Sequence, residues 1–268
     1  MDEKNARISV LMGIYNCTST LVEALDSLYA QTYQDFKIIL CDDCSTDDTF
    51  QVAQDYASQH DNIILIKNEK NIRLAATLNH CIEYADTEYV ARMDGDDISL
   101  PTRFEKEINF LDEHPEYALV SCPMIYFDES GDWGKGNSKE EPQVMDFVNG
   151  SPFCHAPVMM RRSALNEIGN YTVKNTLRRG QDYYLWHKFY LAGYKGYNLQ
   201  EHLYKMRDDK NATRRRTFKD RLNATKVRLE VYKHLSIPLR YYPTAVKGLI
   251  VGMLPKKIYK KLHKQRLK

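Results

Sequence analysis

Apolar residues follow two alternating patterns in the first hundred residues of the chain. Runs of consecutive apolar residues, typical of strands buried on both faces, occupy residues 8–14, 36–41, 63–66 and 88–93. Segments whose apolar residues lie three or four positions apart, typical of amphipathic helices, occupy residues 21–29, 47–59 and 73–85. Strands that alternate with helices in this way form a parallel sheet with helices on both faces. The pattern therefore predicts an α/β fold.

The pattern is less regular after residue 100. It predicts helices over residues 101–113 and 181–192, strands over 117–127 and 154–161, and a polar loop over 128–141. Beyond residue 214 it predicts a basic helix to about residue 235, a break at Pro238, and an apolar run over residues 245–254. We therefore expect a mainly helical, basic C-terminal extension behind the α/β part.

Polar residues follow each of the four predicted strands of the first half. They are Tyr15-Asn16, Asp42-Asp43, residues 68–73 and Asp94-Gly95-Asp96. The carboxyl ends of parallel strands meet at one edge of the sheet, and ligands bind there. The sequence has neither Gly-x-Gly-x-x-Gly nor Gly-x₄-Gly-Lys-Ser/Thr, the motifs whose backbone holds dinucleotides or phosphates. A nucleotide at this edge would therefore depend on carboxylates and a cation.

The segment Asp94-Gly95-Asp96-Asp97 places three carboxylates within four positions, directly after a predicted strand. Carboxylates so close together repel one another unless a cation lies among them. Mg²⁺ and Mn²⁺ prefer oxygen ligands and keep coordination positions for water and substrate phosphates. A solvated acidic turn that caps a helix accounts for the same residues equally well. The four strand ends that converge on this segment favour the metal site.

The small net charge of +2 conceals a strong asymmetry along the chain. Residues 1–209 carry 20 Lys+Arg against 34 Asp+Glu, whereas residues 210–268 carry 18 against 2. A basic tail on an acidic body indicates a polyanionic partner for the tail. The tail has no recognised nucleic-acid-binding motif, so we expect no nucleic acid and an anionic membrane surface bound by residues 238–268. Packing of the basic helix on the acidic body is the alternative.

No positively charged apolar leader opens the sequence, and no run of about 20 apolar residues occurs in it. We therefore expect a cytoplasmic protein that lies peripherally at the inner face of the cell membrane. The six cysteines should be reduced there. Cys41 and Cys44 form a C-x-x-C pair without a second pair, so they are expected to be small buried residues rather than zinc ligands.

Over most of residues 7–210 the chain resembles glycosyltransferase family 2, whose members are inverting sugar transferases of GT-A fold. The resemblance rests on six ordered motifs, in residues 8–16, 41–49, 71–79, 94–104, 155–161 and 181–186. Two departures from the family pattern are visible. Gly13 stands where the family usually has Pro or Thr, and Gln181 stands where Glu commonly precedes the catalytic Asp. The second leaves one carboxylate in that motif, namely Asp182.

The resemblance implies a nucleotide-sugar site made of Tyr15, Asp43, Arg73, Asp94 and Asp96. Tyr15 would stack on the base, and Asp43 would accept the imide N–H of uracil or thymine. Arg73 would lie along the diphosphate, Asp94 at the ribose or the metal, and Asp96 would bind the Mn²⁺ or Mg²⁺. Asp97 is expected to be a structural cap. Tyr15 could instead be a packed aromatic residue, and Arg73 a surface charge at a helix start.

The resemblance also implies a catalytic base, Asp182, at the start of the predicted helix over residues 181–192. An Asp with an ordinary pKa of about 3.9 is ionised at pH 7 and can take the proton of an acceptor hydroxyl. Helix capping is the alternative for Asp182. His155 and Trp186 are expected near the acceptor or the diphosphate, with structural and core positions as their alternatives.

Together these features predict a GT-A catalytic domain over residues 1–210 and a membrane-associating tail over residues 211–268. Residues 1–100 would form the nucleotide half of that domain and residues 101–210 the acceptor half. The expected activity is metal-dependent inverting transfer from a nucleotide-diphospho-sugar, with UDP-sugars favoured, to a polyprenyl-diphosphate-linked glycan in capsule or surface polysaccharide synthesis. A membrane-tethered module that binds nucleotide-sugars without transfer is the alternative. The donor sugar, the linkage and the oligomeric state are left open.

Overall fold

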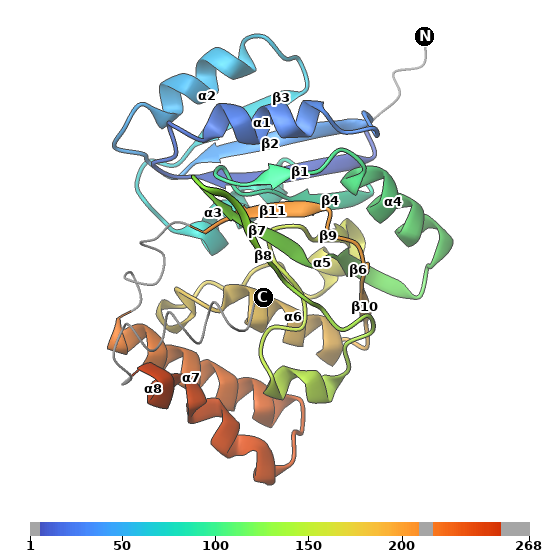
Figure 1. The fold of residues 1–268 in the computed structure, drawn as a ribbon, viewed down its shortest axis with the longest axis vertical. Coiled ribbons are helices and arrows are strands. Elements are labelled where there is room, and N and C mark those ends of the chain that lie inside the picture. Colours follow the sequence, from blue (N-terminus) through green and yellow to red (C-terminus); the bar gives the residue numbers. More distant parts are fainter. Residues whose placement is uncertain (1–5, 209–216, 253–268) are drawn as a thin grey trace.

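A computed structural model describes residues 6–208 and 217–252 of the chain. It has a large and a small β-sheet with helices packed around them (Figure 1). The large sheet contains, in spatial order, β10 (Lys195–Asn198), β6 (Tyr117–Ser121), β9 (Met159–Arg161), β4 (Tyr89–Arg92), β1 (Ile8–Ile14), β2 (Phe36–Asp42) and β3 (Ile63–Lys67). The small sheet contains β5 (Ile98–Ser99), β11 (Tyr204–Arg207), β7 (Met124–Asp128) and β8 (Gly131–Lys135).

The helices up to α6 lie between strands along the chain, whereas α7, η3 and α8 follow the last strand, β11. The α-helices are α1 (Leu21–Tyr29), α2 (Thr49–Ala57), α3 (Leu74–Glu83), α4 (Arg103–Glu113), α5 (Arg162–Glu167), α6 (Gln181–Leu191), α7 (Phe218–His234) and α8 (Lys247–Gly252). The short 3₁₀ helices are η1 (Val144–Val148), η2 (Asn175–Leu177) and η3 (Leu239–Val246). The predicted strand–helix alternation over the first hundred residues is confirmed.

The parallel sheet is confirmed over its first four strands. Strands β3, β2, β1 and β4 are all parallel, and β9 is the antiparallel strand between β4 and β6. The register pairs Ile14 of β1 with Asp42 of β2, and Leu11 of β1 with Arg92 of β4. The polar residues that follow these three strands therefore share one edge of the sheet.

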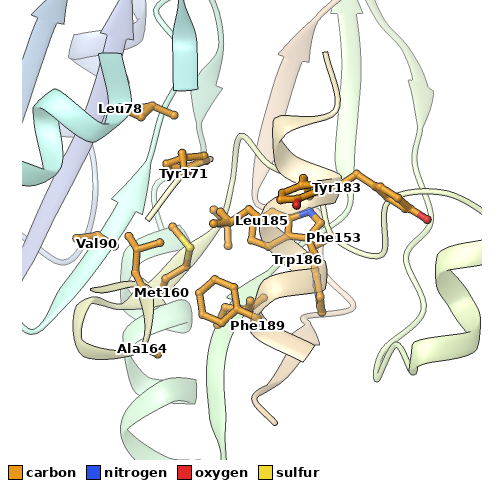
Figure 2. Close-up of a cluster of buried hydrophobic side chains, with 14 of the residues drawn as sticks. Leu78, Val90, Phe153, Met160, Ala164, Tyr171, Tyr183, Leu185, Trp186 and Phe189 are labelled. Carbon is orange, nitrogen blue, oxygen red and sulfur yellow. The ribbon is translucent and has the colours of Figure 1, made fainter. Parts of the chain in front are cut away.

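Alternate residues of β1 point to opposite faces of the sheet and enter two hydrophobic clusters. Val10 and Met12 pack in the cluster that contains residues of α1 and α4. Leu11 packs in the cluster that contains residues of α3 and α6. Figure 2 shows part of this second cluster, with Trp186 and Phe189 of α6 beside Met160 of β9. The sheet is thus fixed from both sides, which holds its polar edge in place.

The described part of the C-terminal extension shares a core with the α/β part. Val231 and Tyr232 of α7 and Ala245 of η3 are at most 1% exposed, in the cluster that also contains Phe147 and Tyr183. Residues 217–252 therefore have no hydrophobic core separate from the body. The predicted division into residues 1–210 and 211–268 remains a prediction, and the most basic part of the predicted tail, residues 253–268, lies outside the described residues.

Three predictions for the second half of the chain were wrong in detail. The strand predicted over residues 117–127 is two strands, β6 and β7, which belong to different sheets; Pro123 lies between them and has no N–H for a continuous ladder. The loop predicted over residues 128–141 contains β8, which follows β7 through a turn at Gly131, with a φ of 101°. Of the strand predicted over residues 154–161, only β9 at its end forms.

Candidate active site

The segments that follow β1, β2 and β3 at this edge of the sheet have unusual backbone geometry. Asn16, Cys44 and Arg73 all have positive φ angles, of 50°, 58° and 73°. Arg73 combines its φ of 73° with a ψ of 159°, a region that glycine alone adopts readily. Such a conformation costs about 1–3 kcal/mol and persists where the surroundings enforce it, often at functional sites.

Asp43 enforces the backbone conformation at Arg73. Its carboxylate is 4% exposed, and Oδ2 accepts a hydrogen bond of 2.8 Å from the Arg73 N–H. Oδ1 accepts hydrogen bonds from the Ile72 N–H and the Asn68 Nδ2, at 2.8 and 2.9 Å. The Asn68 carbonyl in turn lies 2.7 Å from Nδ1 of His80, which orients the amide. Asp43 is therefore a fixed hydrogen-bond acceptor at the edge of the sheet, with lone-pair capacity left on Oδ2.

Tyr15 and Arg73 lie at the surface beside Asp43. The Tyr15 ring is 47% exposed just after β1, and Arg73 is exposed just before α3. Both side chains are thus available to a ligand that reaches Asp43. The structure brings together Tyr15 and Asp43, predicted to hold the base of a nucleotide, and Arg73, predicted to lie along its diphosphate.

The three carboxylates after β4 occupy three different environments. Asp94 forms two hydrogen bonds with the guanidinium of Arg92, which is 2% exposed. Asp97 is 3% exposed, and its Oδ1 accepts a hydrogen bond of 2.8 Å from the backbone of Arg207 in β11. The side chain of Asp96 is exposed at the edge of the sheet. Asp97 therefore ties β11 to this loop, a structural role as predicted.

Gly95 lets this loop lie close to the end of β1. A Cβ atom at position 95 would lie 2.9 Å from Sγ of Cys17 and 3.0 Å from Cγ2 of Ile14, closer than real Cβ contacts. The Gly95 carbonyl also accepts a hydrogen bond from the Thr20 hydroxyl at 2.9 Å. The small residue between Asp94 and Asp96 thus fixes where the two carboxylates lie relative to Tyr15.

Asp96 is suited to bind a divalent cation for which the protein would supply only some of the ligands. The described residues contain no group of three or more His, Cys, Asp or Glu side chains placed to hold a metal ion. Mg²⁺ characteristically takes one or two carboxylates and completes its coordination with water and substrate phosphates. Surrounding protein atoms and the neighbouring charge of Asp94 raise the pKa of Asp96 to about 6. The charge of Asp94 is the second cause of this shift, and a cation at Asp96 would offset that charge.

Asp182 lies at the start of α6 and near the acidic loop. Its Oδ2 accepts a hydrogen bond of 3.4 Å from the Ser151 hydroxyl. Burial raises the pKa of Asp182, while hydrogen bonds from the first backbone N–H groups of α6 and the charge of Arg92 oppose that shift. The ordinary pKa assumed from the sequence is therefore too low for this carboxyl group.

Arg92 is the buried cation that these groups share. It bonds Asp94 directly, and its charge also lowers the pKa of Asp96, Asp182 and His155. Burial is the larger cause for His155, whose pKa lies well below its usual range, so its imidazole is neutral. The guanidinium that pairs with Asp94 thus also exerts its charge on Asp182, 88 positions further along the sequence.

The structure places Trp186 away from any ligand, contrary to the expected contact with the acceptor or the diphosphate. It leaves His155 only one ring nitrogen for such a contact. Trp186 is 0% exposed, and its ring lies edge-on to Phe153 in the core (Figure 2), so it cannot stack on a sugar. Its Nε1 donates a hydrogen bond of 3.1 Å to Oγ of Ser151, the partner of Asp182. His155 Nε2 lies 2.8 Å from the Tyr171 hydroxyl, which uses one of its ring nitrogens within the protein.

Sequence reasoning missed Arg92, Asn68 and Ser151, which support the predicted residues. Arg92 gave a signal, because a charged residue inside an apolar strand must find a partner when it is buried. Asn68 and Ser151 gave none, since polar residues are common in loops and only the fold brings them to Asp43 and Asp182.

The fold is the GT-A architecture of sugar transferases. Residues 9–169 match the model of glycosyl transferase family 2, and this chain belongs to that family. It is 42% identical over 262 residues to a Bacillus subtilis protein described as "Putative glycosyltransferase EpsE", an alignment that covers 97% of this chain and 94% of the relative. The chain is therefore a glycosyltransferase, and its resemblance to that family is confirmed.

A second relative has a more specific description. The Escherichia coli UDP-Gal:alpha-D-GlcNAc-diphosphoundecaprenol beta-1,3-galactosyltransferase is 30% identical over 223 residues, which cover 81% of this chain and 79% of the relative.

Solved structures share the fold at lower identity. S. aureus TarS in complex with UDP-GlcNAc has a TM-score of 0.65 at 19% identity, covering 94% of this chain and 82% of that one. The mannosyltransferase PcManGT from Pyrobaculum calidifontis, in complex with GDP-Man and Mn²⁺, has a TM-score of 0.65 at 18% identity, covering 97% and 79%. The predicted GT-A fold is confirmed.

Proposed function

We propose that this glycosyltransferase moves a sugar from a UDP-sugar to a glycan acceptor linked to a polyprenyl diphosphate, with inversion at the anomeric carbon. The observation that carries the proposal is the buried guanidinium of Arg92, which hydrogen-bonds Asp94 and whose positive charge also acts on Asp96 and Asp182. The activity for which the Escherichia coli relative is named supports the class of donor and acceptor. Synthesis of capsule or a related surface polysaccharide is the setting we propose.

The donor is held by its base and its diphosphate. Tyr15 stacks on the base, and the remaining lone pair of Asp43 Oδ2 accepts the imide N–H of uracil. A base edge with an acceptor at that position, such as cytosine N3, would face a carboxylate without a proton between them. Arg73 lies along the diphosphate, Asp94 at the ribose, and Asp96 holds Mn²⁺ or Mg²⁺. When bound, the cation neutralises charge that grows on the departing diphosphate.

The transfer itself exchanges one C–O bond for another. The acceptor hydroxyl attacks the anomeric carbon as the bond from that carbon to the diphosphate oxygen breaks, and the nucleoside diphosphate departs. Asp182 takes the proton of the hydroxyl. The Ser151 hydroxyl lies 3.4 Å from its Oδ2 and 3.0 Å from the Phe153 carbonyl, so the two oxygens share one donor. Burial favours this proton transfer, because the raised pKa makes Asp182 a stronger base than an exposed Asp.

A donor screen tests the proposed activity. The protein is incubated with Mn²⁺ or Mg²⁺ and with UDP-glucose, UDP-galactose, their N-acetylated and uronic forms, or dTDP-rhamnose. We expect slow hydrolysis of one or more UDP-sugars, measured as released UDP, because water can replace the acceptor in the same site. A protein that binds UDP-sugars tightly but consumes none, with or without a diphosphate-lipid glycan, would instead be the non-catalytic binding module.

The basic C-terminal residues form the proposed contact with the membrane. None of the helices within the described ranges is long and apolar enough to span a bilayer. The predicted contact, residues 238–268, needs revision at its start: Ala245 is 1% exposed, and the Thr225 hydroxyl donates to its carbonyl at 3.4 Å. Within residues 239–246, Ala245, Tyr241 and Tyr242 thus pack against the core, whereas Leu239 is 78% exposed. We propose that residues 253–268, which contain seven Lys+Arg, contact an anionic surface at the inner face of the cell membrane.

Truncation after Gly252 is therefore expected to release the protein from anionic vesicles without unfolding it. Each Lys or Arg near an anionic surface contributes about 1 kcal/mol, so the loss of seven should abolish sedimentation with phosphatidylglycerol vesicles. A full-length variant with these seven residues changed to Gln is the matched control and should behave like the truncation. Equal sedimentation of the truncated and intact proteins would contradict the tail contact.

A further inference from the structure

A cavity of about 480 Å³ lies between the start of α3 and the segment that leads into α6. Its walls are residues 72–76 together with residues 172–175, Leu177, Arg178 and Gln181. These segments are far apart in the sequence, and the second ends at Gln181, which precedes Asp182 in the first turn of α6. A ligand in this cavity therefore contacts the residue next in sequence to the candidate base.

The cavity carries a surplus of positive charge. Arg73, Lys174 and Arg178 line it, and no acidic side chain of the described residues is among those that do. Lys174 lies 3.3 Å from both Glu230 of α7 and the Tyr184 hydroxyl, so Glu230 offsets part of its charge from outside the cavity. Arg178 is exposed. The positively charged side chains in the lining favour binding of an anion.

The cavity also has an apolar wall. Ile72, Leu74, Val173 and Leu177 line it together with the cations. Val173 is 60% exposed, although it is surrounded by polar residues in its own segment. An apolar wall beside cations suits a ligand in which a phosphate group is joined to a hydrocarbon chain. A nucleotide-sugar has the phosphates but no such chain.

One residue of the cavity wall has an unpartnered polar atom. The side-chain carbonyl Oε1 of Gln181 is buried and has no hydrogen-bond partner within the described residues. A buried acceptor without a donor is destabilising. Rotation of this side chain toward the cavity would let Oε1 accept a hydrogen bond from a hydroxyl of a bound ligand.

We propose that this cavity is the acceptor subsite, in which Arg178 and Lys174 bind the diphosphate of a lipid-linked acceptor and Val173 contacts the start of its apolar chain. The inference rests on the proposed function, because that function supplies an acceptor of this chemistry. It adds Arg178, Lys174 and Val173 as residues that recognise the acceptor, and none of them is assigned to the donor. Arg73, which also lines the cavity, remains with the donor diphosphate. Gln181 orients the acceptor sugar in this subsite.

Calorimetric titration with farnesyl diphosphate tests the subsite without any transfer step. We expect Arg178→Gln to weaken binding about 10- to 100-fold, the usual effect of losing a charge-assisted hydrogen bond. Lys195→Gln, at an exposed lysine on the edge strand β10, is the matched control and should bind like the wild type. UDP binding in the presence of Mg²⁺ should be equal in all three proteins.

Val173→Asp provides a second and independent variant. It should weaken binding of farnesyl diphosphate much more than binding of inorganic diphosphate, because it removes the apolar contact. Both positions are exposed, so both variants are expected to keep the melting temperature of the wild type. Affinity for farnesyl diphosphate that is unchanged in both variants would overturn the proposal.

The titration also separates this subsite from the donor site and from the proposed function. A loss of UDP affinity in Arg178→Gln, parallel to its loss of farnesyl diphosphate affinity, would assign the cavity to the donor and overturn the proposal. A negative donor screen would refute the transferase mechanism, yet the binding experiment would still decide whether the cavity holds a lipid-linked diphosphate. The two failures are therefore distinguishable.

Discussion

Asp96→Ala is expected to lower donor turnover by about 10³-fold, the effect of removing a group that stabilises charge in the transition state. Asp96 is the exposed carboxylate of its loop, whereas Asp94 is paired with Arg92 and Asp97 is tied to the backbone of β11. The variant should also lose Mn²⁺ affinity, measured by calorimetry, while its melting temperature stays equal or rises. A rise is reasonable because the substitution removes a carboxylate whose pKa is raised to about 6 by its crowded environment.

Asp61→Ala is the matched control for Asp96→Ala. Asp61 is an exposed carboxylate in the turn before β3. Strand β3 is an edge strand that β1 and β2 separate from β4. Its loss should change neither turnover nor Mn²⁺ affinity. Undiminished turnover in Asp96→Ala would refute the metal assignment, and lost turnover with unchanged Mn²⁺ affinity would place the cation on other residues.

The first half of the fold could be predicted because local pattern and tertiary structure agree there. Strands β1 and β2 are continuous apolar runs buried on both faces, and the helices between them show a clear apolar stripe. Parallel sheets of this kind leave little freedom in strand direction. The polar residues after each strand therefore had to meet at one edge, which located most of the candidate site.

The small sheet could not be predicted in the same way. Strand β8 has the sequence Gly-Asp-Trp-Gly-Lys, without apolar alternation, and forms because β7 offers it an antiparallel partner. Strand β11 lies between β5 and β7, and its first residue, Tyr204, is fully buried. Such pairings depend on which edges the rest of the fold leaves open, and no local sequence signal encodes that.

In the site, residues expected to contact the ligand could be predicted from the sequence, whereas the residues that support them could not. Residue type and position identified Asp43 and Asp96, because a carboxylate that follows a buried parallel strand lies at the edge of the sheet where ligands bind. Trp186 was placed wrongly because its position on α6 suits a sugar contact and a core position equally, and only the packing decides. The support of Asp43 by Asn68 and His80 depends on distances that arise after folding.

Asp182→Asn is expected to retain UDP-sugar binding while transfer to acceptor falls by about 10²- to 10⁴-fold, the usual contribution of a general base. The amide keeps the shape of the carboxylate and can still accept from Ser151 and from the first turn of α6, so the fold should be preserved. An exposed carboxylate, Asp55 on α2, supplies the control, Asp55→Asn, which should transfer normally. Normal transfer by Asp182→Asn would rule out the base role.

The pH profile adds a second readout, because the base acts only when ionised and activity is lost as the pH falls through its pKa. Since burial raises the pKa of Asp182, the acid limb of kcat/KM should lie above the range of an exposed Asp, and it should disappear from the residual activity of Asp182→Asn.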